Sequence, residues 1–164
     1  MKTFKQFLDE SSLSRVVSKS KKGGTAILSG SRADKSPKEN KARAKQLDKD
    51  IRGKGLGGAT KATGRYTEKD DETGKETKVK ERSHIVSSGK KGKRKFKKAI
   101  KSLGKKYGQD SVLIQKKKGT AGLTATRKGG LCDKKSVSIG KMRPGRPDKE
   151  GDTTVKKKPL SYVK

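Results

Sequence analysis

Residues 92–115 read GKRKFKKAIKSLGKKYGQDSVLIQ, and this stretch decides the fold class. Its first part repeats apolar residues at the spacing of one helix face: Phe96, Ala99, Ile100, Leu103 and Tyr107. The pattern predicts an amphipathic helix from about Gly92 to Tyr107. The run SVLIQ at 111–115 is short and apolar, as is typical of a buried strand. We therefore expect the helix to lay its apolar face on a sheet.

A second helix is expected earlier in the chain. Ser36 and Glu39 stand at capping-box spacing, with Pro37 at the first helical position between them. Gly53 should end this helix. Its apolar face would be formed by Ala44, Leu47 and Ile51.

Short runs around the two helices predict strands. They cover Thr25–Ser29, Gly58–Thr67, Thr77–Ser87, Ser111–Gln115 and Gly122–Thr126. The order β-α-β-β-α-β-β predicts an α+β fold, with a small, mostly antiparallel sheet and two amphipathic helices on one face. The residues expected to pack beneath the helices are Ile27, Ile85, Val112 and Ile114.

Shifts in composition divide the chain into four parts. Residues 1–10 form a short amphipathic leader, and residues 11–24 are rich in Ser, Lys and Gly, which indicates a flexible basic linker. Residues 25–128 form the α+β domain. Residues 129–164 are expected to be a loosely attached tail rich in Gly, Pro and Lys, in which Val155–Val163 could add an edge strand.

The composition of the whole chain is strongly basic. Its 164 residues include 47 Lys or Arg and 17 Asp or Glu, for a net charge of +30, while only 26% are hydrophobic. A large core is excluded, and no apolar run is long enough to span a membrane. The partner expected from this charge is double-stranded DNA, bound through its phosphates without regard to sequence.

Eight basic residues on the outer faces of the two helices are the candidate DNA contacts. A solvated helix face normally mixes both signs of charge, whereas these faces are almost entirely positive. The residues are Lys41, Lys45, Lys49, Arg52, Arg94, Lys98, Lys101 and Lys105.

Patterns that could support catalysis or metal binding are weak. Gly53–Gly58 has dinucleotide-loop spacing but follows a helix, whereas such a loop follows a strand. His84 and Glu81 should point to opposite faces of one strand, so they do not form a catalytic pair. One histidine and one cysteine, Cys132, cannot build a zinc site. The sequence therefore favours a protein that is not an enzyme, with no catalytic residues, cofactor or metal.

The first ten residues, MKTFKQFLDE, resemble the capsid-targeting leader of the internal head proteins of T-even-like bacteriophages. The resemblance implies entry into the immature phage head and cleavage by a prohead protease. Leu8 and Glu10 would form the cleavage site, and the processed chain would begin at Ser11. It also implies contact with capsid or scaffold proteins.

Three stretches of the body resemble a small uncharacterised α/β domain of bacteria and phages, to which no activity can be attached. They are LSGSR at 28–32, KATGRYTE at 61–68 and ERSHIV at 81–86.

Together these features favour a phage internal head protein. Such a protein would lie with the packaged DNA inside the virion and could reach the host cytoplasm with the genome. The first alternative is a structural capsid or neck component. The second is a host-directed inhibitor, for instance an anti-restriction protein.

Overall fold

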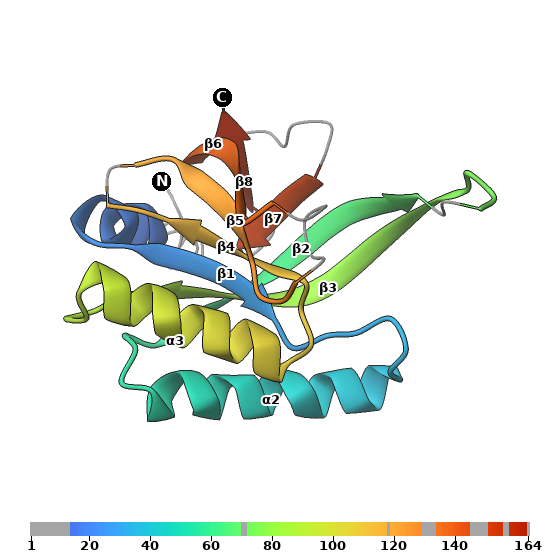
Figure 1. Ribbon diagram of the computed structural model, residues 1–164, viewed down its shortest axis with the longest axis horizontal. Coiled ribbons are helices and arrows are strands. Elements are labelled where there is room, and N and C mark those ends of the chain that lie inside the picture. Colours follow the sequence, from blue (N-terminus) through green and yellow to red (C-terminus); the bar gives the residue numbers. More distant parts are fainter. Residues whose placement is uncertain are drawn as a thin grey trace, which may run out of the picture.

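Antiparallel strands close into a barrel, and two helices lie together on one side of it (Figure 1). This computed structural model describes residues 14–69, 72–117, 119–128, 134–144, 151–155 and 158–163. The barrel order is β1-β3-β2-β7-β8-β6-β5-β4, and every described strand pair is antiparallel.

The elements follow one another in the predicted order as far as β5. They are β1 (Thr25–Ser29), α2 (Pro37–Gly53), β2 (Ala59–Lys69), β3 (Glu76–Ser87), α3 (Lys93–Lys106), β4 (Ser111–Gln115), β5 (Ala121–Ala125), β6 (Ser136–Pro144), β7 (Gly151–Val155) and β8 (Lys158–Val163). The predicted α+β class is confirmed, as are the two helices on one face of the sheet.

The predicted cap of α2 forms. The Glu39 N–H donates to Ser36 Oγ at 3.2 Å, and the Ser36 N–H donates to Glu39 Oε2 at 2.8 Å. Leu47 and Ile51 are fully buried beneath the helix. The capping box fixes where the helix starts, and that start sets which residues face the sheet.

The barrel wall separates two apolar clusters, because side chains alternate along each strand. The outer cluster joins Leu28, Val86 and Val112 of the sheet to Ile100 and Leu103 of α3. The inner cluster contains Ile27 and Ile85. The expectation that Ile27 and Ile85 lie beneath the helices is therefore wrong, whereas Val112 and Ile114 do pack there.

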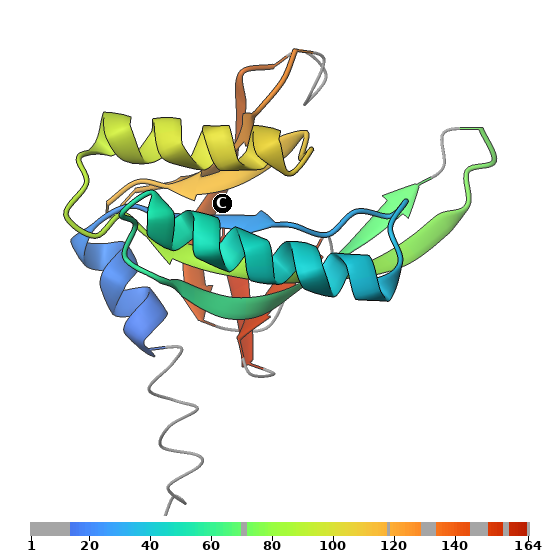
Figure 2. The same cartoon turned by 90° about the horizontal axis from the view of Figure 1, so that it is seen from below.

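Residues 14–22 form a helix where a flexible linker was expected (Figure 2). Val16 is 2% exposed and packs with Ile27 and Ile85 of the inner cluster. Ser20, one turn later, is also buried. An apolar residue and a small one at i and i+4 are enough to seat this short helix against the barrel.

The C-terminal region contributes strands to the barrel where a loose tail was expected. β6 pairs with β5, and β7 pairs with β2, so these strands supply partners to two edges of the predicted sheet. Pairing both edges leaves no open strand at either place, which favours closure despite the many glycines, lysines and prolines.

β2 and β3 continue beyond the barrel as a two-stranded arm (Figures 1 and 2). Their register extends from Ala59↔Val86 to Lys69↔Glu76. The predicted leader and its site at Leu8, Glu10 and Ser11 lie outside the described residues, as does Cys132. Within the described part of the chain, no helix is both long and apolar enough to cross a membrane.

Candidate active site

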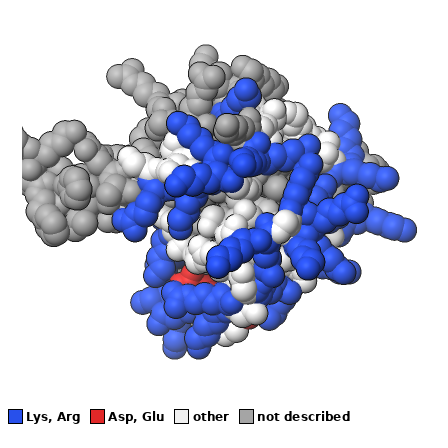
Figure 3. Space-filling model, turned by 90° about the vertical axis from the view of Figure 1, so that its left-hand side faces the viewer, with Lys and Arg blue, Asp and Glu red and all other residues white. Residues whose placement is uncertain are grey.

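The two ends of the barrel carry different side chains. The basic end consists of lysines and arginines from the helix 14–22, the turn after α2, the start of α3 and the β4–β5 turn. These are Lys19, Lys21, Lys22, Arg52, Lys54, Lys90, Lys91, Lys93, Arg94, Lys116 and Lys117. Figure 3 shows this face covered by positive side chains.

The basic end offers little internal space. A cavity of about 10 Å³ lies between the helix 14–22 and the barrel, with Val16, Thr25 and Ser87 in its wall. That is the space of roughly one water molecule. Thr25 Oγ1 has no hydrogen-bond partner among the described residues. The cavity suits a single water rather than a substrate.

The eight predicted DNA contacts are all exposed on α2 and α3. Lys41, Lys45, Lys49 and Arg52 lie on α2, and Arg94, Lys98, Lys101 and Lys105 lie on α3. They project from the side of each helix that is turned away from the outer apolar cluster.

The opposite end, here called the polar end, is built from Ser29, Gly64, Glu81, Ser83 and Gln109. Ser29 pairs with Ser83 across β1 and β3, and Gly64 pairs with Glu81 across β2 and β3. Ser29 and Ser83 are buried, while Glu81 and Gln109 are half-buried. Polar groups thus replace the apolar residues that fill the barrel further in.

Gly64 makes room for the two side chains beside it. A Cβ at this position would lie 3.0 Å from Ser83 Oγ and 3.4 Å from Glu81 Cγ. The same distances show that Ser83 and Glu81 extend over the inner face of β2. Any larger residue at 64 would have to displace at least one of them.

Gln109 completes the polar end from the turn between α3 and β4. The described register of β1 and β4 ends at Ile27↔Leu113, so no strand partner meets the Ser29 N–H on that side. Gln109 Oε1 accepts that N–H at 3.0 Å. This bond engages the amide oxygen of Gln109 and leaves its NH₂ group as the donor end.

Ser29 is held by three hydrogen bonds and is not set up as a nucleophile. Its Oγ donates to the Arg82 carbonyl at 2.7 Å and accepts the Ser31 N–H at 3.0 Å. No base contacts it through either bond. Its role is to fix the end of β1 beside Gln109.

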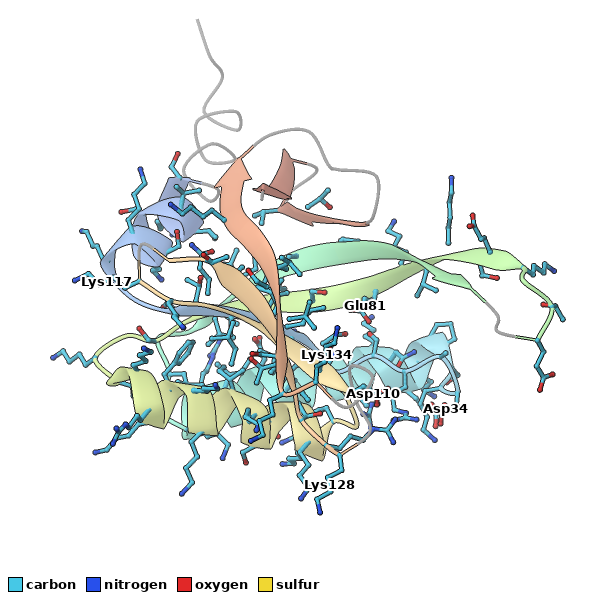
Figure 4. All side chains as sticks on the ribbon, turned by 45° about the horizontal axis from the view of Figure 1, so that its top comes forward. Asp34, Glu81, Asp110, Lys117, Lys128 and Lys134 are labelled. Carbon is cyan, nitrogen blue, oxygen red and sulfur yellow. The ribbon has the colours of Figure 1, made fainter. Side chains whose placement is uncertain are left out.

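Charged residues surround the polar end. Arg32 Nε lies 2.7 Å from Asp34 Oδ1, and Arg127 Nη2 lies 2.6 Å from Asp110 Oδ1. The hydrogen bond from Arg32 holds the pKa of Asp34 below its usual range. In Figure 4 Glu81 and Asp110 lie near Lys134, with Asp34 further to the right, while Lys117 lies at the left-hand side.

His84 lies on the face of β3 that is turned toward α2. It is 2% exposed, and its Nε2 lies 3.5 Å from Asp48 Oδ1. Burial lowers the pKa of His84 despite the opposing effect of Asp48. A neutral imidazole on the face opposite to Glu81 takes no part in the polar end.

A polar cluster locks α2 against the end of α3. Asp50 Oδ2 accepts hydrogen bonds from Tyr107 Oη and from Lys106 Nζ, each at 2.7 Å. The bond from Lys106 lowers the pKa of Asp50, while burial and Asp50 raise that of Tyr107. Arg43 lies over the Tyr107 ring at 5.4 Å. This cluster fixes the turn that precedes Gln109.

Comparison with known proteins identifies the family. The model of the S-adenosylmethionine lyase family matches residues 26–163, so the chain belongs to that family. A solved structure of a phage SAM lyase in complex with S-methyl-5′-thioadenosine is similar at 16% identity and a TM-score of 0.39; the match covers 71% of this chain and 88% of that one. No curated protein matches the chain.

The family corrects three expectations. The expectation that the chain is not an enzyme is wrong, because the family is one of lyases. An internal head protein that associates with packaged DNA is also the wrong function, and the capsid and DNA-binding roles have no support. Net charge dominated that interpretation, although charge reports on solubility and association rather than on a reaction.

The sequence alone did not bring together the residues of the polar end. Ser29, Gly64, Glu81 and Ser83 all lie in the three stretches that resembled an uncharacterised domain. The register of the predicted hairpin could have brought Gly64 and Glu81 together. Once the hairpin is drawn, Gly64 faces Glu81 and a small residue sits beside a carboxylate on the inner face. Among the described residues, no group of three or more His, Cys, Asp or Glu could hold a metal ion.

Proposed function

We propose that this protein cleaves S-adenosylmethionine at the polar end of its barrel. The observation that carries the proposal is the family match over residues 26–163, which includes every strand of the barrel and both helices beside it. The match therefore extends over nearly the whole barrel and the helices α2 and α3, and does not rest on one motif; the helix 14–22 lies outside it.

The chemistry of such a cleavage needs no proton transfer. The sulfonium of S-adenosylmethionine leaves as a neutral thioether, S-methyl-5′-thioadenosine, and takes the electron pair of the bond between sulfur and the γ-carbon. The substrate's own carboxylate oxygen forms the new bond to that carbon and closes a five-membered lactone of homoserine. The net charge is +1 before and after, because the ammonium is retained. The protein has to bind the substrate and hold the carboxylate behind the γ-carbon.

Glu81 supplies the negative charge that a cationic substrate needs on a protein of net charge +30. We assign it to the substrate ammonium. The sulfonium loses its charge during the reaction, so a carboxylate beside it would favour the ground state. The ammonium keeps its charge throughout, and a carboxylate beside it costs nothing in the transition state.

Gln109 can orient the other end of the same half of the substrate. Its amide oxygen is engaged by Ser29, so its NH₂ group is the end that can donate to the substrate carboxylate. As the substrate carboxylate attacks, its negative charge and the positive charge of the sulfonium are both lost. Such a reaction is faster where water is excluded. The inner cluster provides an apolar floor with Ile27, Ile85 and Leu113.

Removal of S-adenosylmethionine gives the expected host-directed inhibitor a chemical mechanism. Any restriction enzyme that requires this compound would lose it. Of the alternatives drawn from the sequence, the anti-restriction protein is the one that the family supports.

The test is direct conversion of the substrate. Purified full-length protein is incubated with S-adenosylmethionine, and S-methyl-5′-thioadenosine is followed by chromatography. We expect stoichiometric thioether and a lactone that carries no label when the reaction is run in H₂¹⁸O.

Two glutamine variants locate the site. Glu81→Gln should lower kcat/KM by about 100-fold or more, since a charge-assisted contact to the substrate is lost. Glu76→Gln, on the same strand at an exposed position, is the matched control and should stay within about twofold of the parent. Absence of any thioether with the parent protein would contradict the proposal.

A further inference from the structure

We infer that Arg32 is a positioning residue for the lyase site: it holds the 108–110 turn so that Gln109 stays seated on Ser29. The inference rests on the proposed function, because Gln109 belongs to the proposed substrate contacts. Arg32 itself lies outside the polar end, on the β1–α2 loop, and touches none of the residues assigned to the substrate.

The backbone of Arg32 is held by two hydrogen bonds to Asn40. Its N–H donates to Asn40 Oδ1 at 2.9 Å, and its carbonyl accepts from Asn40 Nδ2 at 3.0 Å. Asn40 lies in the first turn of α2 and also donates to the Lys35 carbonyl at 3.2 Å. The loop is therefore tied to a capped helix and not left to find its own conformation.

The guanidinium of Arg32 makes two contacts at once. Its Nε donates to Asp34 Oδ1 at 2.7 Å, and its Nη1 donates to the Gly108 carbonyl at 3.0 Å. The planar fork of arginine makes the two bonds from two different nitrogens in one orientation, whereas a lysine would have to reach both oxygens from a single nitrogen. The bond to Asp34 thus orients the guanidinium, and the bond to Gly108 connects it to the 108–110 turn.

Gly108 is shaped to receive this side chain. Its φ is +72°, a conformation that L side chains rarely adopt, and a Cβ there would collide with Arg32 Nη1. The residue that follows is Gln109, whose carbonyl accepts from Thr126 Oγ1 and whose side chain accepts the Ser29 N–H. The Arg32 bond therefore acts one peptide away from the amide that we assign to the substrate.

The β1–α2 loop and the turn after α3 stay together without Arg32. Arg43 joins the same two segments, with Nε bonded to the Gly30 carbonyl at 2.6 Å and Nη2 to the Tyr107 carbonyl at 2.8 Å. A variant at Arg32 should keep these two segments joined and lose only the contact with Gly108. This separation makes the inference testable without unfolding the protein.

The experiment compares Arg32→Ala with a matched control, Arg127→Ala. Both arginines pair with an aspartate beside the polar end and contact the 108–110 turn, but Arg32 reaches the backbone carbonyl of Gly108, whereas the described contacts of Arg127 reach only the side chain of Asp110. We expect Arg32→Ala to lower kcat about tenfold or more with KM within about threefold, because misplacement of a catalytic contact affects the reaction more than binding. Arg127→Ala should stay within about twofold. Millimolar guanidinium chloride, against sodium chloride, should restore part of the kcat of Arg32→Ala, and Arg32→Lys should not match the parent.

Hydrogen exchange of the Ser29 amide gives a readout that needs no substrate. In Arg32→Ala this amide should exchange at least about tenfold faster than in the parent, while Arg127→Ala leaves it unchanged. If the parent does not cleave S-adenosylmethionine, the proposed function fails, and the exchange result still decides whether Arg32 seats Gln109. Unchanged Ser29 exchange, or an equal loss of kcat in both alanine variants, would overturn the inference.

Discussion

The polar end and the basic end belong to one barrel and are built in opposite ways. The basic end gathers many like-charged side chains from four segments, and the small pocket described there has room for roughly one water. The polar end uses a few small or polar residues whose positions are fixed by strand register and hydrogen bonds. A large number of like charges is therefore a poor guide to a site, and the proposed site rests instead on a single carboxylate held by strand register.

The largest expected difference between the two ends concerns Gly64. Gly64→Ala should lower lyase kcat/KM by about tenfold or more, because the new methyl group would lie only 3.0 Å from Ser83 Oγ and would fill the space beside Glu81 Cγ at 3.4 Å. Gly53→Ala is the control, since a Cβ there meets nothing within 4 Å. Kinetics on both variants check this, and equal activities would mean that Glu81 and Ser83 tolerate displacement.

The largest expected effect on stability concerns the core that supports both ends. Leu103 is fully buried between α3 and the sheet, so Leu103→Ala should reduce the free energy of unfolding by about 2–5 kcal/mol. Urea denaturation followed by circular dichroism measures this. A loss below about 1 kcal/mol would show that α3 contributes little to the barrel.

A smaller effect is expected at the cluster that precedes Gln109. Tyr107→Phe removes the hydrogen bond to Asp50 and keeps the ring beneath Arg43, so it should cost about 0.5–1.5 kcal/mol. Thermal unfolding of Tyr107→Phe, of Asp50→Asn and of the double variant gives the coupling between the two groups. Additive losses would mean that the bond does not stabilise the fold.

The pH dependence of stability should depend on His84. Burial lowers its folded pKa below the ordinary value of 6.5, so the unfolded chain binds the proton first as the pH falls. Tm should therefore be constant above about pH 7.5 and fall as the pH drops through 6.5 and below. His84→Gln should flatten this part of the curve, measured at constant ionic strength. An identical slope in parent and variant would assign the dependence to other groups.

The smallest effect on catalysis should come from the basic end. Replacing Lys19, Lys21 and Lys22 by Gln removes three exposed charges far from Glu81. We expect kcat/KM to change by less than about twofold, because interactions beyond a Debye length of about 8 Å are screened at physiological salt. A rise of tenfold or more would show that long-range repulsion of the cationic substrate limits the reaction.

The helices and the first strands could be predicted because their signals are local. The capping box at Ser36 and Glu39 and the 3.6-residue spacing around Ile100 specify α2 and α3 without reference to the rest of the chain. Strand faces are harder to assign. TAILS is buried along its whole length, so the pattern does not tell whether Ile27 or Leu28 meets the helices.

The site could not be predicted because no single segment contains it. Ser29, Gly64, Glu81 and Gln109 come from four places and meet only through the register of β1, β2 and β3 and one side-chain hydrogen bond. Barrel closure was also hidden, since β6 to β8 have weak strand patterns and are stabilised by pairing with existing edges. Local propensity is a poor guide where pairing partners decide the structure.

The pairing of β2 with β7 has a consequence for how the protein is made. Gly64 pairs with Thr153, so the strand that bears Gly64 waits for a partner that comes much later in the sequence. During synthesis on a ribosome, β1, β3 and both helices can assemble while that edge is still uncovered, because contacts so distant in sequence form late. The strand that bears Gly64 should therefore gain its second partner only after residues 151–155 have been synthesised, and a nascent chain stalled before residue 150 should be helical and inactive.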